Sequence, residues 1–158
     1  MAFDQREFRT ALGHFATGIT VVTARTGDGE LVGVTVNSFN SVSLDPPLIL
    51  FSLERRALSL PAFEEAGSFA VNILSASQTA LSQNFARTQG DKWRGIACEY
   101  WTTGSPILSD CLAAFDCRTH AIHDGGDHRI FIGEVLRFDG KSEGDPLIYF
   151  RGSYTALK

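Results

Sequence analysis

The chain has 158 residues, of which 18 are acidic and 14 are basic, so its formal net charge at pH 7 is -4. This length suits one domain with its own core, and we expect residues 1–158 to form a single domain. No run of lysines or arginines would follow a nucleic-acid backbone, and polar residues interrupt every apolar run before the ~20 residues needed to span a bilayer.

The N-terminal segment predicts a short helix followed by a hairpin. Phe8, Leu12 and Phe15 have the spacing of one apolar helical stripe, and the helix is expected to end near Gly18. Residues 19–24 and 31–39 are rich in β-branched side chains and flank a turn-forming stretch, which is typical of two antiparallel strands.

The stretch "GVTVNSFNSVSLDPPLILFSL" (33–53) has an unusual run of small polar side chains. In a strand, alternate residues share one face, so the side chains of this stretch would form a polar ladder beside an apolar one. The polar ladder consists of the alternate positions Thr35, Asn37, Phe39, Ser41 and Ser43. Two prolines then separate this ladder from the next strand, 48–53, because proline cannot donate a ladder hydrogen bond. We interpret the ladder as a binding surface for a polar, planar ligand.

The rest of the chain predicts further strands with a few short helices. We expect helices over 59–67 and 75–86, and strands over 68–74, 111–123, 129–138 and 146–150. The loop 87–106 contains Trp93, Tyr100 and Trp101, which are suited to anchor it over a site or a partner chain. Six or seven mostly antiparallel strands with short turns favour a closed or nearly closed barrel.

Several kinds of site are disfavoured by the sequence. It has none of the nucleophile-elbow, zincin, Walker or Rossmann motifs. Two of the downstream histidines, His120 and His123, would point to opposite faces of a strand, so we expect no metal site. Cys98, Cys111 and Cys117 form an odd set without a CxxC pair, which indicates free thiols. With no signal-peptide pattern at the N-terminus, we expect a cytoplasmic protein.

Several segments together resemble the flavin reductase-like proteins of the FMN-binding split-barrel fold, the reductase components of two-component flavin monooxygenases. The resemblance runs through "FATGITVVTA", the 33–53 stretch, "FAVNILSASQTALSQNFA", "GDHRIFIGEV" and "PLIYFRGSY". It implies a mainly β, antiparallel split β-barrel of Greek-key type with a few short flanking helices.

The resemblance also implies where a flavin would bind. Side-chain and backbone groups of the 33–43 stretch would meet the ring edge and then the polyol or phosphate, with further contacts from the end of the next strand and its turn. The implied flavin contacts are Thr35, Asn37, Ser38, Ser41, Ser43, Ser52, Arg56, Ser59 and Phe85. Arg56 is either a phosphate ligand or a solvated surface charge, and Phe85 is either close to the flavin or a core residue. Ala57 and Leu58 stand where the family often has a hydroxyl, so FMN and FAD both remain possible.

The motif "GGDHRIFIGEV" (125–135) is the second informative segment. Gly125 and Gly126 allow a tight turn that would project Asp127 and His128. In the proteins that the chain resembles, this histidine lies beside the nicotinamide, so His128 would position the dihydronicotinamide. Asp127 would orient the imidazole or cap the turn.

The function implied is an NAD(P)H:flavin oxidoreductase that transfers hydride from NADH, or less favourably NADPH, to FMN or FAD. The cofactors carry the reactivity, which is consistent with the missing catalytic triad. The reduced flavin would pass to a separate oxygenase, and the family resemblance implies a homodimer. Two alternatives remain open, a flavin-binding or storage protein of the same barrel and a split-barrel oxidase of a small substrate.

Overall fold

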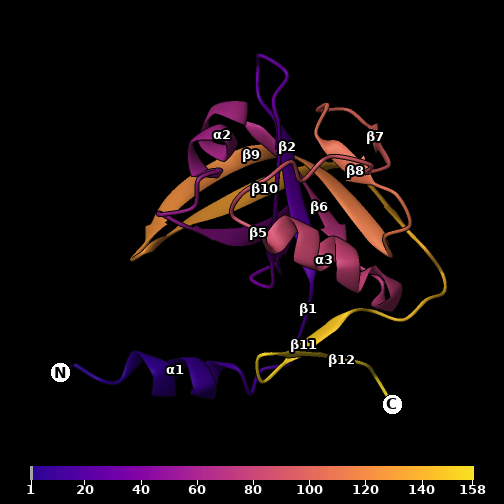
Figure 1. The fold of residues 1–158 in the computed structure, drawn as a ribbon. Coiled ribbons are helices and arrows are strands. Elements are labelled where there is room, and N and C mark those ends of the chain that lie inside the picture. The colour runs from indigo at the N-terminus through magenta and orange to yellow at the C-terminus, as the bar shows by residue number, and fades with distance from the viewer. Residues whose placement is uncertain (1) are drawn as a thin grey trace.

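The computed structural model describes residues 2–158. Its centre is a seven-stranded antiparallel sheet with the order β3-β2-β6-β9-β10-β5-β4 (Figure 1). The strands are β2 (Thr20–Arg25), β3 (Leu31–Val36), β4 (Asn40–Leu44), β5 (Pro47–Glu54), β6 (Ser68–Ile73), β9 (Ala113–Gly125) and β10 (His128–Gly140). The predicted mainly β, antiparallel architecture is confirmed.

Short elements surround the sheet. Within the described residues the helices are α1 (Gln5–Leu12), α2 (Leu60–Ala66) and α3 (Thr79–Ala86), with a 3-10 turn η1 (Ala76–Gln78) before α3. Two smaller sheets combine β1 (Thr17–Gly18), β11 (Ile148–Phe150) and β12 (Ser153–Thr155), and β7 (Cys98–Tyr100) with β8 (Pro106–Leu108). These short strands raise the strand number above the six or seven expected.

The main core is built around four phenylalanines that are essentially inaccessible to solvent. Phe51 of β5 stacks on Phe131 of β10 with ring centroids 4.9 Å apart, and Phe63 of α2 and Phe69 of β6 meet them edge to face. Each such ring contributes about 1.5–3 kcal/mol through burial. The cluster fixes β5 against β10 and holds α2 over that end of the sheet.

Strand β2 is buried on both faces from Thr20 to Ala24, and its two buried threonines donate their hydroxyl hydrogens to backbone carbonyl oxygens. Val22 and Ala24 face the phenylalanine core, while Val21 packs in a second cluster with Leu74 and Phe85. Helix α3 lies over this outer face (Figure 1). The second cluster therefore holds α3 beside β3, where the site is formed.

The sheet is split between its two edge strands, β3 and β4, which are consecutive in the chain. β4 pairs only with residues 47–50 of β5, so the following part of β5 has no strand neighbour on that side among the described residues. On that side, Ser38 makes the hydrogen bonds that a neighbouring strand would otherwise make. Its hydroxyl donates to the Ser52 carbonyl oxygen at 3.0 Å and accepts from the Ser52 N–H at 2.9 Å.

The structure corrects the prediction of one continuous polar ladder. β3 ends at Val36, the chain bends through 37–39, and β4 begins at Asn40. Ser41 and Ser43 consequently lie on a different strand from Thr35. The alternation of polar and apolar residues did not predict this bend, because serine and asparagine suit both a solvent-exposed strand face and a bend.

The N-terminal helix also ends earlier than predicted. α1 stops at Leu12, with Gly13 as its C-cap, and Gly18 pairs with Ile148 in β1. Phe8, Leu12 and Phe15 are all exposed in the single chain. α1, β11 and β12 lie at one end of the molecule, away from the main sheet (Figure 1). The predicted apolar stripe therefore has no part in the core.

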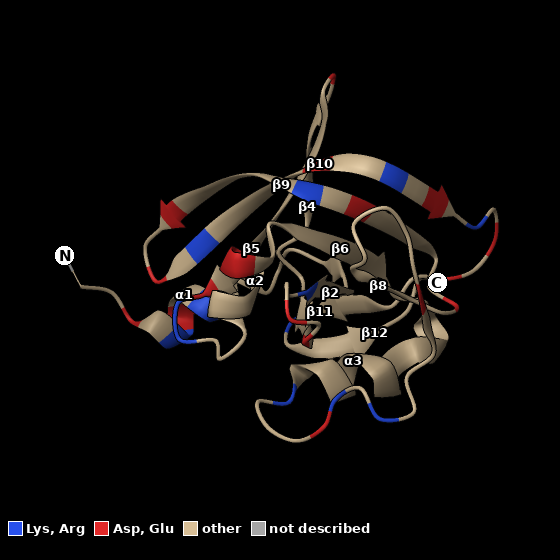
Figure 2. Cartoon of the chain, turned by 90° about the horizontal axis from the view of Figure 1, so that it is seen from above, with Lys and Arg blue, Asp and Glu red and all other residues tan. Residues whose placement is uncertain are grey.

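The distribution of charges and the length and hydropathy of the helices agree with what the sequence predicted. Acidic and basic residues are interspersed along β9 and β10 (Figure 2). Among residues 2–158, no helix combines the length and hydropathy that a membrane crossing requires.

The Ser38 bridge generates a stability prediction. We expect Ser38→Ala to lower the free energy of unfolding by about 1–2 kcal/mol, because both backbone groups of Ser52 lose their partner. Ser41→Ala, an exposed serine on β4, is the matched control and should change it by less than about 0.5 kcal/mol. Urea unfolding measures both variants, and an equal effect of the two would contradict the bridging role.

Candidate active site

A pocket of about 730 Å³ lies at the split between β3 and β5. β3 and the bend after it form one side, and the end of β5 with the turn 56–59 forms the other. The end of α3 and the loop 87–93 form the back wall, and His128 lies at the rim. The volume is within the range of small-molecule and cofactor sites.

The structure brings most of the predicted site residues together here. Lining the pocket are Thr35, Asn37, Ser38, Ser52, Arg56, Ser59, Phe85 and His128. Ser41 and Ser43 lie outside its lining because they follow the bend onto β4. Asp127 is also outside the lining, although it contacts His128.

The edge of β3 presents hydrogen-bonding groups to the pocket. Lys92 Nζ donates to the Gly33 carbonyl oxygen at 3.3 Å, so this carbonyl points away from β2. Because backbone groups alternate sides along a strand, the N–H and C=O of Thr35 face the same free edge. The Thr35 hydroxyl donates to the Ser82 carbonyl oxygen at 2.6 Å, which leaves its lone pairs as acceptors. Asn37 is exposed at the bend.

The back wall is aromatic and closely packed. Phe85 and Trp93 meet edge to face with ring centroids 5.0 Å apart, and both rings lie against Gly33. Phe85 is fully buried, so core packing accounts for its position. Sequence analysis did not assign Gly33, although a glycine inside a strand signals a close approach of another group.

Lys92 is a second residue that sequence analysis missed. Its ammonium group also donates to the carbonyl oxygen of Phe85 at 3.3 Å, which joins the loop to the end of α3. Burial, and then the charge of Arg87, lower the pKa of Lys92. Asn84 strengthens the same junction by donating to the Lys92 carbonyl oxygen at 2.6 Å. The pocket wall thus contains a half-buried cation in a braced loop.

His128 and Asp127 form a hydrogen-bonded pair at the rim. The imidazole Nδ1 lies 2.7 Å from Asp127 Oδ1, and this hydrogen bond lowers the pKa of the carboxyl group. Since a carboxylate only accepts hydrogen bonds, Nδ1 is the donor and Nε2 is left for another partner. The predicted orienting role of Asp127 thus has a matching contact in the structure.

The two neighbouring arginines behave differently. Arg56 lines the pocket with a side chain that is 88% exposed, and its nearest ion-pair partner is Glu54 at 4.0 Å. Arg55 instead donates from Nε to the Gly126 carbonyl oxygen at 2.8 Å and also contacts Asp124. Ser59 precedes α2 without a side-chain capping bond, so its hydroxyl is not committed to the helix.

The structure gathers no cluster of three or more potential metal-binding side chains anywhere in residues 2–158. The arrangement combines an aromatic wall, a polar strand edge and an oriented imidazole. Such a pocket can bind a flat heteroaromatic molecule by its edge and hold a second ring near His128.

Comparisons with known proteins agree with this chemistry. A family model described as "Flavin reductase like domain" matches residues 12–158. FMN reductase (NADH) SmoA of Agrobacterium fabrum is 48% identical over 96% of this chain and 85% of that protein. The reductase component of 4-hydroxyphenylacetate 3-monooxygenase from Thermus thermophilus is 43% identical over 95% of both chains.

A solved structure extends the likeness to three dimensions. The Streptomyces globisporus NADH:FAD oxidoreductase SgcE6, solved in complex with NAD and FAD fragments, superposes with a TM-score of 0.93. The two chains are 31% identical, and the match covers 98% of this chain and 93% of that one.

The close approach at Gly33 generates a prediction for the pocket. A Cβ at this position would lie 2.7 Å from Phe85 Cε1 and 3.2 Å from Trp93 Cζ2. We expect Gly33→Ala to destabilise the protein by about 1–3 kcal/mol through overpacking and to weaken ligand binding in the pocket. Gly18→Ala, whose added Cβ meets nothing within 4 Å, is the matched control. Thermal unfolding and FMN titration measure the stability and the flavin affinity of both variants. A Gly33→Ala variant with the stability and FMN affinity of the wild type would contradict the close packing at this position.

Proposed function

The chain belongs to the flavin reductase-like domain family, and on this premise we propose that it transfers hydride from NADH to FMN or FAD and supplies the reduced flavin to a separate monooxygenase. The observation that carries the proposal is the single pocket in which the β3 edge and His128 face the same space. The names of the relatives support the same chemistry, since they include an NADH-dependent FMN reductase and a monooxygenase reductase component.

The pocket fits a flavin in size and in chemistry. An isoalloxazine ring has hydrogen-bond donors and acceptors along one edge, and the β3 edge offers Thr35 backbone groups and hydroxyl lone pairs together with the Asn37 amide. Ser38 and Ser52 lie beside them, with the Ser38 hydroxyl hydrogen already donated to the sheet. The aromatic wall with Trp93 provides apolar surface for the ring system.

The contacts of the flavin side chain are proposed on the other side of the pocket. Arg56 and Ser59 are free to meet a phosphate and a polyol hydroxyl, respectively, at the turn after β5. A phosphate is common to FMN and FAD, so these contacts serve both nucleotides. The relatives include both an FMN reductase and an FAD-binding oxidoreductase.

His128 is proposed to position the dihydronicotinamide. Its Nδ1 donates to Asp127, so a neutral imidazole presents Nε2 as an acceptor for the carboxamide N–H. The β3 edge would hold a flavin whose N5 would serve as the hydride acceptor, with NADH as the hydride source and solvent as the source of the one proton needed to form dihydroflavin. The protein orients the two rings and excludes water, and its side chains transfer no proton in the hydride step.

We propose NADH as the preferred donor and a cytoplasmic location. SmoA of Agrobacterium fabrum and SgcE6 of Streptomyces globisporus are both named for NADH as the nicotinamide donor. The rival interpretations, a flavin-storage protein and an oxidase of a small substrate, predict that NADH is not consumed. The oxygenase that would receive the reduced flavin is a separate chain, and that chain would determine the organic substrate.

We further propose that the protein is a homodimer. Exposed large apolar side chains that gather on one surface are typical of interaction sites. Phe8, Leu12 and Phe15 are exposed together on the N-terminal arm, and Leu44 on β4 and Phe138 on β10 are exposed on other elements. A second copy of the chain would cover these side chains. This coverage would explain why α1 has an apolar stripe although the stripe takes no part in the core of its own chain.

The reductase proposal predicts NADH consumption that depends on added flavin. His128→Ala should raise the KM for NADH by about three- to tenfold, the range of one lost hydrogen bond, and leave the FMN affinity unchanged. His123→Ala, an exposed histidine on β9, is the matched control. Steady-state rates in air, and bleaching of the flavin band without oxygen, measure the activity. Flavin binding without oxidation of NADH or NADPH would favour the storage protein.

The dimer proposal predicts a mass of two chains by light scattering at micromolar concentration. The double variant Phe8→Asp with Leu12→Asp should be monomeric, since it places two charges in the apolar stripe. Thr10→Asp on the opposite side of α1 should remain dimeric. A monomeric wild type would contradict the proposal.

A further inference from the structure

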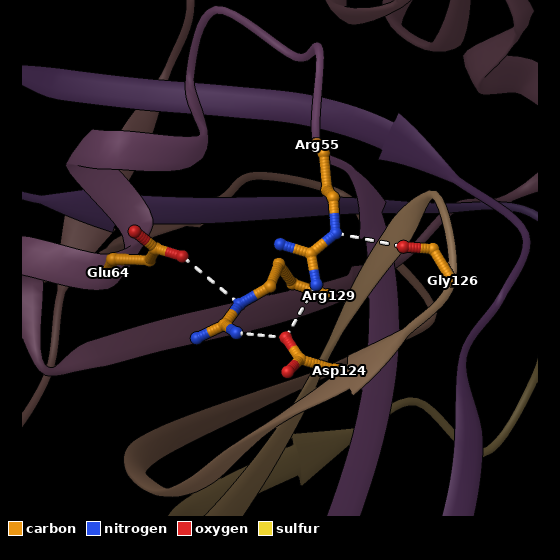
Figure 3. A network of polar contacts seen from close by, with 5 residues as sticks. All are labelled: Arg55, Glu64, Asp124, Gly126 and Arg129. Carbon is orange, nitrogen blue, oxygen red and sulfur yellow. Dashed lines mark hydrogen bonds and ion pairs between the residues drawn. The ribbon is translucent and has the colours of Figure 1, made fainter.

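The turn that carries Asp127 is held by three contacts from one residue, Arg55. Arg55 N–H donates to the Asp127 carbonyl oxygen at 2.9 Å, and its Nε donates to the Gly126 carbonyl oxygen at 2.8 Å. Its Nη2 donates to Asp124 Oδ1 (Figure 3). The regular ladder between β5 and β10 ends at Glu54 opposite His128. Arg55 therefore fixes the part of the turn that lies beyond the ladder.

A second arginine connects the same turn to α2. Arg129 Nη1 donates to Asp124 Oδ1, the oxygen that Arg55 contacts, and Arg129 Nε makes an ion pair with Glu64 Oε1 at 3.2 Å (Figure 3). The two guanidinium groups, Arg55 first, hold the pKa of Asp124 below its ordinary value. The network thus joins the turn to the helix that begins beside Ser59, on the flavin side of the pocket.

The brace acts on residues 126 and 127, the two that lie outside the ladder between β9 and β10. Gly126 has a φ of +68°, a conformation natural to glycine and entropically costly to hold. The Asp127 side chain is 94% exposed, so water competes for its carboxylate. The Arg55 Nε contact with the Gly126 carbonyl oxygen at 2.8 Å fixes the peptide group that joins Gly126 to Asp127. The position of Asp127 then determines where its carboxylate accepts the hydrogen bond from His128 Nδ1.

We propose that Arg55 is a positioning residue for the nicotinamide site. By fixing the turn 126–127 and the Asp124 carboxylate at the end of β9, it holds Asp127 where its carboxylate selects the His128 tautomer with hydrogen on Nδ1 and directs Nε2 toward the carboxamide. This inference rests on the proposed function, because it assigns His128 to the dihydronicotinamide. The Arg55 side chain is 44% exposed, and exposed ion pairs add little stability, so its effect should appear in substrate positioning.

The first test needs neither substrate nor activity. In wild-type protein labelled with ¹⁵N-histidine, the NMR spectrum should show the neutral His128 imidazole with hydrogen on Nδ1. Arg55→Gln should produce a mixture of both tautomers, because the Gly126 carbonyl oxygen and Asp124 lose the Arg55 guanidinium group, although the backbone contact to the Asp127 carbonyl oxygen is kept. Arg118→Gln is the matched control, because Arg118 pairs with Glu134 at 3.0 Å on the same hairpin and lies outside the turn. An unchanged tautomer in Arg55→Gln would overturn the proposal.

The second test separates positioning from stability. Arg55→Gln should raise the KM for NADH by about two- to fivefold, less than His128→Ala, because it misplaces the imidazole without removing it, with kcat and FMN affinity nearly unchanged. Arg55→Lys should fall between the two, since one ammonium group cannot replace a planar fork with several donors. Arg118→Gln should match the wild type within about twofold.

A double-mutant cycle with His128 makes the test specific. In the His128→Ala background, Arg55→Gln should change the KM for NADH by less than about twofold, because its effect passes through the missing imidazole. The same increase in both backgrounds would overturn the positioning role. If the wild type oxidises no NADH, the proposed function fails, and the imidazole spectra alone decide whether Arg55 positions His128.

Discussion

The two hydrogen bonds between the Ser38 hydroxyl and the Ser52 backbone are the constraint on which the site depends. They satisfy the backbone of β5 on the side away from β10, where none of the strands in residues 2–158 pairs with Ser52, so the sheet can remain split without an unpartnered polar group at that point. A strand in the same place would have covered the edge of β3. The single side chain leaves that edge free to bind a ligand.

The pocket that follows from this split is assembled from segments far apart in the chain. Its back wall is rigid, because Gly33 admits the rings of Phe85 and Trp93 and Lys92 joins the loop to the end of α3. Its rim is held by the backbone and side chain of Arg55. Hydride transfer requires the two rings to be placed to within a few tenths of an ångström, and the contacts of the chain serve this placement.

Much of the fold and part of the site could be predicted from the sequence. The β-branched runs gave the central strands, and the adjacent glycines of 125–126 indicated the turn that presents His128. The bend after Val36 could not be predicted, because small polar residues fit a strand and a bend equally well.

The choice between neighbouring residues depends on tertiary contacts. Arg55 and Arg56 have the same chemistry in the sequence, and only the hairpin brought next to β5 distinguishes the turn contact from the pocket contact. Lys92 was overlooked for a similar reason, since its partners, Gly33 and Phe85, come from two other elements. Spacing along the chain carries no information on such pairings.

The most direct test of the central claim is a crystal structure of the protein with FMN and NAD⁺ bound together. The account predicts the isoalloxazine edge on Thr35 and Asn37, and nicotinamide C4 over flavin N5 at about 3.5 Å. It also predicts a carboxamide hydrogen bond to His128 Nε2. A flavin bound away from the split, or a nicotinamide on the side remote from His128, would contradict the account.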